Sequence, residues 1–270
     1  MPELPEVETT LRGIAPHITG RAVTGVVVRQ PKLRWPIPDN LTELLHQQPL
    51  SGISRRGKYL LLHFPGGILL IHLGMSGSLR IVTEAMPALF HDHVDLAFGE
   101  VILRYCDPRR FGCLLWVEGD PQEYALLRHL GPEPLTEAFS GEYLYERSRK
   151  RNLPVKQFIM TNDIVVGVGN IYANESLFMA RIKPIRKAGS LTRKNCDDLV
   201  RDIKFVLERS ITQGGTTLRD FVGGDGKPGY FQQQLLVYGR AGKPCPECSK
   251  PLKEVRMGGR STVYCTDCQR

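Results

Sequence analysis

Long apolar segments are missing from this sequence. The longest apolar runs, such as residues 68–71, are far shorter than the ~20 residues that a membrane-spanning helix needs. The opening residues, MPELPE, are acidic and contain two prolines, so they lack the basic and apolar regions of a signal peptide. From these absences we expect a cytosolic protein with no membrane partner.

Internal repeats and low-complexity segments are also absent, and acidic residues are scarcer than basic ones. A hydrophobic content of 41% is ordinary for a globular protein, and 270 residues suffice for one large domain or two modest ones. The 28 acidic residues stand against 36 Lys and Arg, which gives a net charge of +8. This excess favours a polyanionic partner, because neutralised phosphates release bound counterions, although many basic proteins never bind nucleic acid.

Four of the seven cysteines lie near the end of the sequence. Two pairs, each with two intervening residues, have the spacing of a tetrahedral zinc site: Cys245, Cys248, Cys265 and Cys268. Four thiolates leave no position for water, so this zinc would be structural, in a β-hairpin that includes residues 262–264. A redox pair or two disulfides is the alternative, which a reducing cytosol disfavours. The remaining cysteines have no partner at ligand spacing and are expected to pack in the interior: Cys106, Cys113 and Cys196.

The first half of the chain has the pattern of an antiparallel β-sandwich. Short β-branched or apolar runs alternate with turn residues over residues 23–28, 59–64, 68–73, 94–98, 101–105 and 114–117. One helix comes before them, because Val7, Leu11 and Ile14 recur at helical spacing. Pro5 suits the first turn of that helix, and Pro16 is expected to end it.

The second half is predicted to be helical. The sequence GPEP at 131–134 breaks the β pattern and is typical of a linker. Beyond it, helical spacing extends over residues 143–149, 155–160, 171–180 and 196–211. A glycine-rich loop at 223–226 and the cysteine-rich tail follow. The fold class is therefore expected to be α+β.

A glycine-punctuated turn at residues 166–169 separates two of these helices. With Asn170 at the start of the next helix, backbone N–H groups and the Asn170 amide would point at one place, which favours an anion site. Glycines that merely allow two helices to approach closely are the alternative, and the pattern alone leaves both open.

Two turns between strands carry side chains that could enter a DNA duplex. Arg109 and Phe111 lie in the segment DPRRFG at 107–112, and Met75 lies between glycines in segment 72–77. A protein that extracts a base must fill the hole in the duplex, and Met, Phe and Arg are suitable side chains. Burial in the core is the commoner fate of Met and Phe, and it is the alternative here.

The N-terminus offers a nucleophile. Once Met1 is removed, Pro2 is a secondary amine that can attack a sugar C1′ and form an iminium ion. That cation acidifies the C2′ proton, so base removal leads to strand cleavage by elimination, with Glu3 nearby for acid–base chemistry. The pattern of residues alone favours a simple helix start instead, in which Pro2 and Pro5 begin the helix and Glu3 and Glu6 favour its positive end.

The opening PELPEVET at residues 2–9 resembles the start of bacterial formamidopyrimidine-DNA glycosylases, also called 8-oxoguanine DNA glycosylases. The resemblance continues, in order, along nearly the whole chain. Its segments are 34–36 (RWP), 58–60 (KYL), 72–80 (HLGMSGSLR), 91–95 (HDHVD), 107–112 (DPRRFG), 166–172 (VGVGNIY), 226–230 (GKPGY) and the four-cysteine tail. The resemblance favours Pro2 as a nucleophile over the simple helix start.

The resemblance implies an N-terminal antiparallel β-sandwich with a leading helix, a helical domain with a helix–two-turn–helix, and a C-terminal zinc-finger β-hairpin. We expect the catalytic sandwich at 1–130, a linker at 131–141, the helical DNA-binding domain at 142–235 and the zinc finger at 236–270. The implied activity is removal of oxidised purines from damaged double-stranded DNA, followed by β,δ-elimination at the abasic site. One structural Zn²⁺, a monomer and association with the bacterial nucleoid through DNA are also expected.

Catalytic roles follow from the same resemblance. Pro2 would be the Schiff-base nucleophile and Glu3 the proton donor. Lys58 would assist β-elimination, and Arg260 would assist δ-elimination or hold phosphates around the lesion. An attached Met1 would turn the Pro2 nitrogen into an amide, which cannot act as the nucleophile.

The resemblance also implies the DNA contacts. DNA would be bound by His91, Arg109, Arg151, Lys156 and Asn170. Met75, Arg109 and Phe111 would fill the void left by the everted base, with Arg109 facing the estranged cytosine. The family often carries Lys where this chain has Arg151.

Two other functions compete with this interpretation. Endonuclease VIII-like enzymes of the same superfamily prefer oxidised pyrimidines, but their start typically reads Pro-Glu-Gly-Pro, so Leu4 favours the purine branch. A non-catalytic binder of damaged DNA would use the same basic surface and zinc hairpin. It would have no need for Pro2, Glu3 and Lys58 together, which disfavours it.

Overall fold

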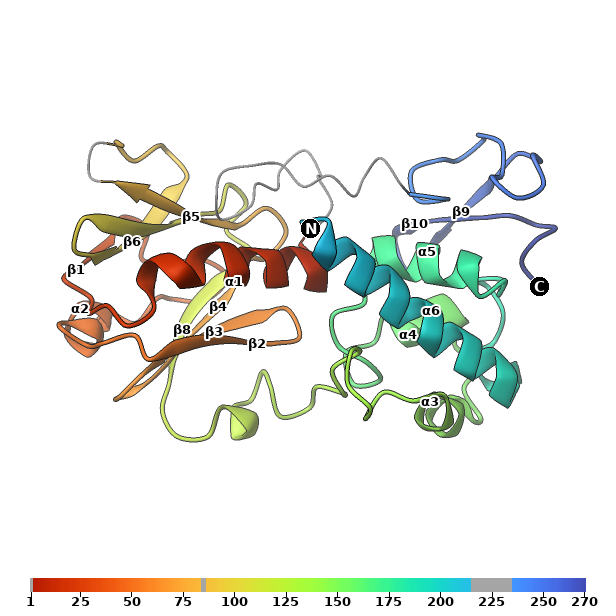
Figure 1. Cartoon of the computed structure of the whole chain (residues 1–270), viewed down its shortest axis with the longest axis horizontal. Helices are drawn as coiled ribbons and strands as arrows, with labels where there is room; N and C mark the ends of the chain where they lie inside the picture. Colours follow the sequence, from red (N-terminus) through yellow and green to blue (C-terminus); the bar gives the residue numbers. More distant parts are fainter. Residues whose placement is uncertain (1, 84–85, 215–234) are drawn as a thin grey trace. The chain divides into compact units, whose positions relative to one another are not determined.

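The computed structural model describes residues 2–83, 86–214 and 235–270 (Figure 1). Contacts divide the chain into two compact units, one containing residues 2–128 and the other residues 129–212 and 235–270. The expected glycine-rich loop at 223–226 and the segment 226–230 lie outside the described residues. None of the described helices is both long and apolar enough to cross a membrane.

Two antiparallel four-stranded sheets form the first unit, which confirms the predicted sandwich. Their strand orders are β1-β6-β7-β5 and β2-β3-β4-β8. The strands are β1 (Gly25–Val28), β2 (Gly52–Arg56), β3 (Tyr59–Phe64), β4 (Gly67–His72), β5 (Ser78–Thr83), β6 (Asp92–Phe98), β7 (Val101–Cys106) and β8 (Cys113–Val117). The same unit contains the helices α1 (Leu4–Ile18) and α2 (Leu41–Leu45) and a short 3₁₀ turn, η1 (Pro121–Glu123).

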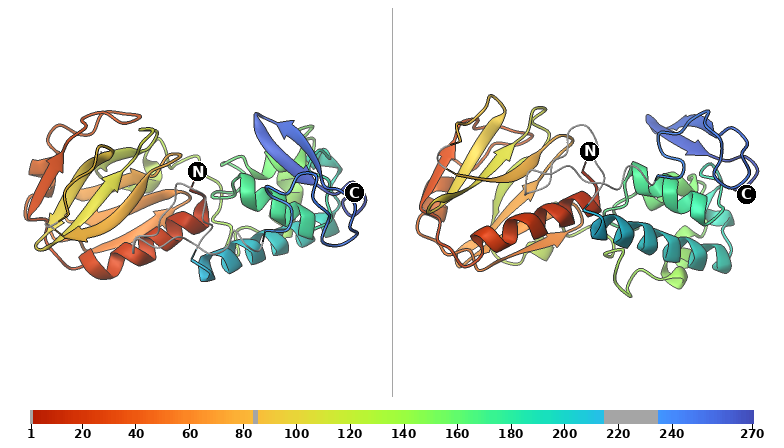
Figure 2. Two further views of the ribbon diagram at one scale, coloured as in Figure 1. Left: turned by 90° about the horizontal axis from the view of Figure 1, so that it is seen from above. Right: turned by 45° about the horizontal axis from the view of Figure 1, so that its top comes forward.

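Apolar side chains from both sheets meet in one core. Leu62 of β3 and Phe98 of β6 belong to the same buried cluster, and both are almost fully buried. Helix α1 packs against strands of both sheets (Figure 2) and adds Ile14 and Ile18 to this core. The leading helix is therefore part of the sandwich, and the core fixes the position of its first turn.

The first helix begins as predicted but does not end at Pro16. Pro5 lies in its first turn, whereas α1 continues through Pro16 to Ile18. Proline removes one N–H donor, but the N–H of Thr19 still donates to the Ala15 carbonyl at 3.0 Å. Burial of Ile18 in the core outweighs the single lost hydrogen bond.

Four elements of this unit were not predicted: β2, β5, α2 and the 3₁₀ turn η1. Strands β2 and β5 each lie at an edge of their sheet. Strand β2, with the sequence GISRR, is half-exposed or exposed along its length. Pairing with β3 stabilises β2, so its own residues need not show an apolar pattern. Strand β5 buries Leu79 and Val82, so its omission has no such explanation. Helix α2 is only five residues long, too short for a periodic pattern.

The described part of the second unit contains four α-helices and a 3₁₀ turn. They are α3 (Gly141–Ser148), α4 (Val155–Ile159), α5 (Asn170–Met179), η2 (Ala188–Ser190) and α6 (Arg193–Thr212), and the four α-helices match the predicted helical segments. Ser140 is the N-cap of α3, and its Oγ accepts a hydrogen bond from the Tyr143 N–H at 3.1 Å. Helix α6 packs against both α3 and α5.

A β-hairpin completes this unit, as predicted. Strands β9 (Lys253–Met257) and β10 (Arg260–Tyr264) pair antiparallel, and β10 packs on α5. Its small core contains Phe178 of α5, Val237, Leu252 and Val263, together with Cys245 and Cys265. Because few apolar groups pack in this core, the stability of the hairpin depends on its cysteines.

Candidate functional site

Pro2 and Glu3 lie buried at the start of α1. Glu3 is the N-cap of the helix, and its side chain accepts a hydrogen bond from the backbone N–H of Glu6. In return, the Glu3 N–H donates to Glu6 Oε2 at 2.9 Å. This capping box fixes the backbone directly after Pro2. Sequence reasoning assigned Glu6 only to the helix dipole, although the Glu3-x-x-Glu6 spacing is a recognisable capping signal.

The same helix holds the turn that carries Lys58. Glu8 of α1 accepts a hydrogen bond from Arg55 Nε of β2 at 3.0 Å, and Arg55 Nη1 donates to the Gly57 carbonyl at 2.9 Å. Lys58 follows in the β2–β3 turn and is half-buried. Burial opposes ionisation of Glu8, but hydrogen bonds from Arg55 and Arg12 outweigh it and lower the Glu8 pKa. An ionised Glu8 thus ties the Lys58 turn to the helix that begins beside Pro2.

His72 lies at the end of β4, directly before the Met75 turn. Its Nδ1 accepts the Gly74 N–H at 2.9 Å, and its ring lies 4.7 Å from that of Tyr59. Burial, and next the positive charge of Lys58, lower the pKa of His72 from 6.5 to about 4. The imidazole is therefore neutral in the folded protein at neutral pH.

This neutral histidine should make the fold sensitive to acid. Because its folded pKa lies below its unfolded value, its stabilisation is complete above pH 6.5 and is lost as pH falls towards 4. At ~1.4 kcal/mol per pKa unit, the wild type should lose roughly 2 kcal/mol more unfolding free energy between pH 7.5 and 4.5 than His72→Asn. Asn keeps an acceptor near the Nδ1 position but does not titrate. Urea unfolding at both pH values measures the difference, and equal losses in the two proteins would contradict it.

Met75, Arg109 and Phe111 lie at the surface of the sandwich unit. Met75 is 37% exposed in the β4–β5 turn and Phe111 is 46% exposed in the β7–β8 loop, so the core alternative is wrong for both. The Arg109 guanidinium lies over the Phe111 ring, 5.0 Å from its centroid. Exposed apolar groups beside a cation suit insertion between bases better than burial in the protein.

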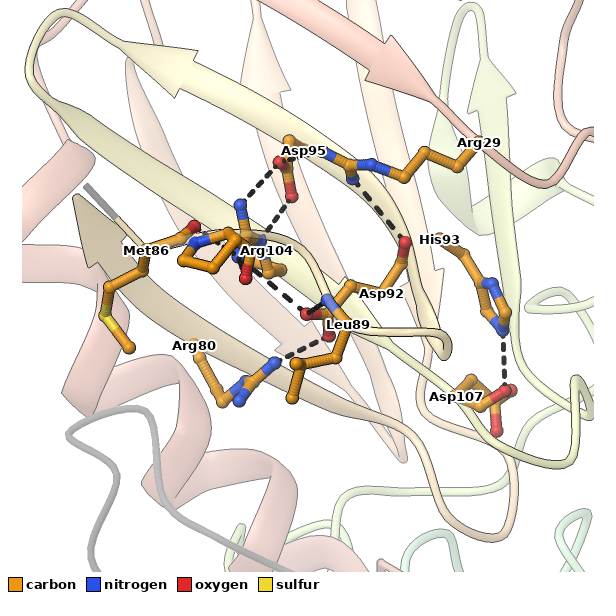
Figure 3. A network of polar contacts seen from close by, with 10 residues as sticks. Arg29, Arg80, Met86, Leu89, Asp92, His93, Asp95, Arg104 and Asp107 are labelled. Atoms are coloured by element: carbon orange, nitrogen blue, oxygen red, sulfur yellow. Dashed lines mark hydrogen bonds and ion pairs between the residues drawn. The ribbon is translucent and has the colours of Figure 1, made fainter. Parts of the chain in front are cut away.

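His91 is half-buried in the loop before β6, and a charge network fixes this loop (Figure 3). Arg104 Nη1 donates to the carbonyls of Met86 and Pro87 at 2.9 and 3.1 Å. The buried carboxylate of Asp92 accepts the Leu89 N–H at 2.9 Å and pairs with Arg80 at 2.6 Å. Sequence reasoning did not identify this network.

The network continues along β6 to a second carboxylate. Arg104 makes two hydrogen bonds to Asp95, at 2.8 and 2.9 Å, and Arg29 makes a third at 2.6 Å. Burial opposes ionisation of Asp95, but these hydrogen bonds outweigh it and lower the Asp95 pKa. The ionised pair thus keeps Arg104 in place beside the loop that leads to His91.

In the second unit, Lys156 and Arg260 line one pocket, together with Gln157, Thr161 and Gly258. Arg260 is exposed at the start of β10. Lys156 is 1% exposed, and its Nζ donates to the Ser261 carbonyl at 2.8 Å and to Thr262 Oγ1 at 2.7 Å. The structure therefore places this lysine against the hairpin as well as in the pocket.

Asn170 and Arg151 occupy two other places in this unit. Asn170 is the first residue of α5, after a turn in which Gly167 has a φ of +81°. Its Oδ1 is buried and has no hydrogen-bond partner in the described part of the chain, so the fold leaves this acceptor unused. Arg151 is exposed between α3 and α4.

The four predicted zinc cysteines lie together. Their sulfur atoms are all within 4.8 Å of one another, with Cys245–Cys268 at 3.9 Å and Cys248–Cys265 at 3.5 Å. A tetrahedron with zinc–sulfur bonds of ~2.3 Å has sulfur–sulfur edges of about 3.8 Å, whereas a disulfide is ~2.05 Å long. The sulfurs thus fit a zinc ion, and the disulfide alternative is excluded.

Further contacts prepare and hold this centre. Burial raises the pKa of Cys265, but hydrogen bonds from the backbone N–H groups of Cys268 and Asp267 outweigh this effect and lower the pKa to about 7. The lowered pKa favours the thiolate that zinc binds.

The other cysteines are not part of the centre. Cys113 and Cys196 are buried and Cys106 is half-buried, each as an unpaired thiol.

Two residues that sequence reasoning missed hold the hairpin and the segment before it on α5. Asn174 Oδ1 accepts the Val263 N–H at 2.8 Å. Glu175 is 2% exposed and accepts N–H groups from residues 236–238 at 2.7 to 3.0 Å. Burial raises the pKa of Glu175, and these hydrogen bonds oppose the rise. The run of three polar residues at 174–176 in the middle of a mostly apolar helix was the available signal.

Three family models match successive parts of the chain. The formamidopyrimidine-DNA glycosylase N-terminal domain matches residues 1–114, and the formamidopyrimidine-DNA glycosylase H2TH domain matches residues 130–222. A zinc finger found in FPG and IleRS matches residues 242–270.

Curated relatives match over full length. A formamidopyrimidine-DNA glycosylase of Cellvibrio japonicus is 73% identical over 270 residues, covering 100% of both chains. One from Saccharophagus degradans is 59% identical with the same coverage.

Solved structures have the same fold. The MutM (Fpg) protein of Thermus thermophilus matches with a TM-score of 0.89 and 40% identity, covering 99% of this chain and 98% of that one. A Lactococcus lactis Fpg variant in complex with Fapy-dG containing DNA matches with a TM-score of 0.93 and 33% identity, covering 100% of both chains. On the combined family matches and full-length identities, this chain belongs to the formamidopyrimidine-DNA glycosylase family.

Proposed function

We propose that this chain is a base-excision repair enzyme that releases oxidised purines from duplex DNA and then cleaves the strand at the abasic site. The observation that carries the proposal is the start of α1, where Pro2 and Glu3 lie buried next to each other in a chain of a DNA glycosylase family. Solved relatives hold DNA that contains Fapy-dG, a carbocyclic 8-oxo-G or an abasic site. These are a substrate, a substrate analogue and a product of the proposed reaction.

Pro2 supplies the nucleophile in this proposal. Once Met1 is removed, the secondary amine attacks C1′ of the damaged nucleotide while the bond to the base breaks. Glu3 is the proton donor, and the capping box keeps its backbone fixed relative to Pro2. Pro2 then loses its N–H proton, and the C1′–O4′ bond breaks as the ring oxygen O4′ accepts the proton that Glu3 donates. The product is an iminium ion between Pro2 and C1′ of the opened sugar.

The iminium ion makes strand cleavage by elimination possible. Its positive charge acidifies the C2′ proton, and loss of that proton expels the 3′ phosphate in β-elimination. Lys58, whose turn is tied to α1 through Arg55 and Glu8, assists this step. A second elimination expels the 5′ phosphate, and Arg260 assists there or holds the phosphates.

The remaining site residues bind DNA. The pocket lined by Lys156 and Arg260 suits a phosphate, because both side chains are cationic. Asn170 at the N-terminus of α5 and the exposed Arg151 add further backbone contacts. We also propose the boundaries 1–130, 131–141, 142–235 and 236–270 for the sandwich, linker, helical domain and zinc finger. A single chain acting on the nucleoid fulfils this function.

The two competing functions are less well supported. Relatives of 73% and 59% identity are named for formamidopyrimidines, which are ring-opened purines, so the purine branch is favoured over oxidised pyrimidines. A protein that only binds damaged DNA would have no use for Lys58 in a turn that is fixed to α1, the helix that begins next to Pro2.

A single-turnover excision assay tests the proposal and the role of Arg109 together. The wild type should release 8-oxoguanine faster opposite cytosine than opposite adenine, and faster than it releases an oxidised pyrimidine. A polar contact to a base is worth roughly 1–3 kcal/mol, so Arg109→Ala should reduce the preference for cytosine by about ten- to a hundredfold. Lys156→Ala should weaken binding to any duplex but leave the preference for cytosine unchanged, because the backbone phosphate is the same whichever base is opposite the lesion. An unaltered preference in Arg109→Ala would make Arg109 one more phosphate contact.

A further inference from the structure

The turn that carries Met75 and the loop that carries Phe111 lie backbone against backbone. Gly74 has a φ of +63°, and a Cβ added there would lie 2.5 Å from both Gly112 N and Phe111 C. A Cβ on Gly112 would lie 1.9 Å from the Tyr105 hydroxyl oxygen and 2.4 Å from the His72 carbonyl oxygen. No side chain fits between these segments, so a shift of one segment is transmitted to the other.

Asp107 is the polar group that links the two segments. It is fully buried, and each of its carboxylate oxygens accepts two hydrogen bonds. Oδ1 accepts from Ser76 Oγ at 3.0 Å and from the Arg109 N–H at 3.3 Å. Oδ2 accepts from the Gly112 N–H at 2.8 Å and from the Tyr105 hydroxyl at 3.2 Å. One carboxylate thus holds the residue after Met75 and both ends of the Arg109–Phe111 segment.

The main chain of Asp107 adds the segment of His91. Its N–H donates to the His91 carbonyl at 3.1 Å. Its carbonyl lies 2.8 Å from His93 Nε2, a contact drawn in Figure 3. Three segments that carry candidate DNA contacts therefore meet at one residue. Asp107 itself is too deeply buried to touch DNA.

We propose that Asp107 is a positioning residue that joins the Met75 turn, the Arg109–Phe111 loop and the His91 loop into one rigid platform, so that the inserted side chains enter the duplex as a unit. This inference rests on the proposed function. Rigid loops lose little conformational freedom when DNA binds, and they keep Arg109 in the one position that suits cytosine. Independent loops would let Arg109 adapt to either opposite base.

Hydrogen exchange of the DNA-free protein tests the physical link. In Asp107→Asn one carboxylate oxygen becomes an NH₂ group, which faces donors in either orientation of the amide. Amide exchange in the segment 109–112 should rise about tenfold or more, and exchange in 73–77 should rise with it. Ser76→Ala removes one hydroxyl and should produce a smaller rise in both segments.

Control variants change comparable groups in the other unit. Asp202→Asn alters a buried aspartate that pairs with Arg201, and Ser210→Ala removes a buried hydroxyl that bonds to Tyr172. Both should leave exchange in the two segments at the wild-type rate. A rise in 109–112 without any rise in 73–77 would overturn the inference, because the segments would then move independently.

The cytosine-to-adenine excision ratio tests the functional consequence. The folded fraction cancels in this ratio, so a general loss of stability does not change it. Asp107→Asn should lower the ratio by about fivefold or more, Ser76→Ala by about two- to threefold, and the controls should match the wild type. A wild-type ratio in Asp107→Asn would reduce Asp107 to a structural role and overturn the inference. A wild type that releases no base at all would overturn the proposed function and the positioning role with it, while the exchange data still report on the platform.

Discussion

Protein that retains Met1 should form no borohydride-trapped adduct with duplex DNA containing 8-oxoguanine opposite cytosine, whereas protein that begins at Pro2 should be trapped efficiently. The reason is the state of the Pro2 nitrogen. A terminal proline is a secondary amine with a free lone pair, but in a Met1–Pro2 peptide bond that lone pair is delocalised into the carbonyl. Borohydride reduces only the iminium ion, so trapping reports covalent attachment directly.

Substitutions refine the test. Pro2→Gly leaves a primary amine in the same place and should weaken trapping without abolishing it. Pro5→Ala is the matched control, because it changes a proline in the first turn of α1 but leaves the terminal amine intact. Intact mass establishes whether Met1 is present in each preparation. Undiminished trapping by protein with confirmed Met1 would move the nucleophile to a lysine, with Lys58 as the first candidate.

The first turn of α1 illustrates what a sequence can and cannot decide. The helix-start interpretation of Pro2 to Glu6 describes the backbone correctly, since Glu3 and Glu6 form a capping box. It does not exclude chemistry, because the cap fixes the very residues that a nucleophilic terminus needs. The physical pattern alone favoured the simple helix, and only the resemblance along the whole chain favoured the nucleophile.

The fold was predictable where packing leaves a periodic pattern. The central strands β3, β4, β6 and β7 and the four helices of the second unit bury apolar faces, and their predicted ranges agree with the structure to within a few residues. The edge strand β2 left no such pattern, because its residues are half-exposed or exposed and its pairing with β3 defines it. Strand β5 was missed although it buries Leu79 and Val82. The end of α1 was wrong because a local rule for proline was outweighed by the burial of Ile18 in the core.

The sequence suggested candidate residues for contact with a partner, but it gave little sign of the residues that would position them. Asp107, Asn174 and Glu175 work through neighbours distant in the sequence, such as Ser76 and Val263. No local spacing marks such contacts. Lys156 illustrates the difference. Its charge suggested a phosphate, and its two hydrogen bonds to the hairpin appear only in three dimensions.

Loss of the zinc ion should unfold the β9–β10 hairpin and reduce DNA affinity by about a hundredfold or more, while the sandwich stays folded. A two-stranded hairpin is at best marginally stable alone, and here four cysteines supply much of its anchoring. Without metal, thiolates brought within 4.8 Å of one another repel. Arg260 begins β10 and Lys156 donates to Ser261 and Thr262, so unfolding removes one cation and releases the other.

Cys248→Ser is the sharpest variant, because it removes one ligand at an exposed position where the substitution disturbs no core packing. Cys106→Ser is the matched control, since that cysteine belongs to β7 of the sandwich unit and lies outside the cluster. Metal analysis should find one zinc per chain in the wild type and in Cys106→Ser, and much less in Cys248→Ser. Amide hydrogen exchange across residues 245–268 should be faster in Cys248→Ser than in the wild type or Cys106→Ser. Exchange in β3 and β4 should be the same in all three proteins. Full DNA affinity in a zinc-free Cys248→Ser protein would show that Asn174 and Glu175 suffice to hold the hairpin and that the metal is dispensable for binding.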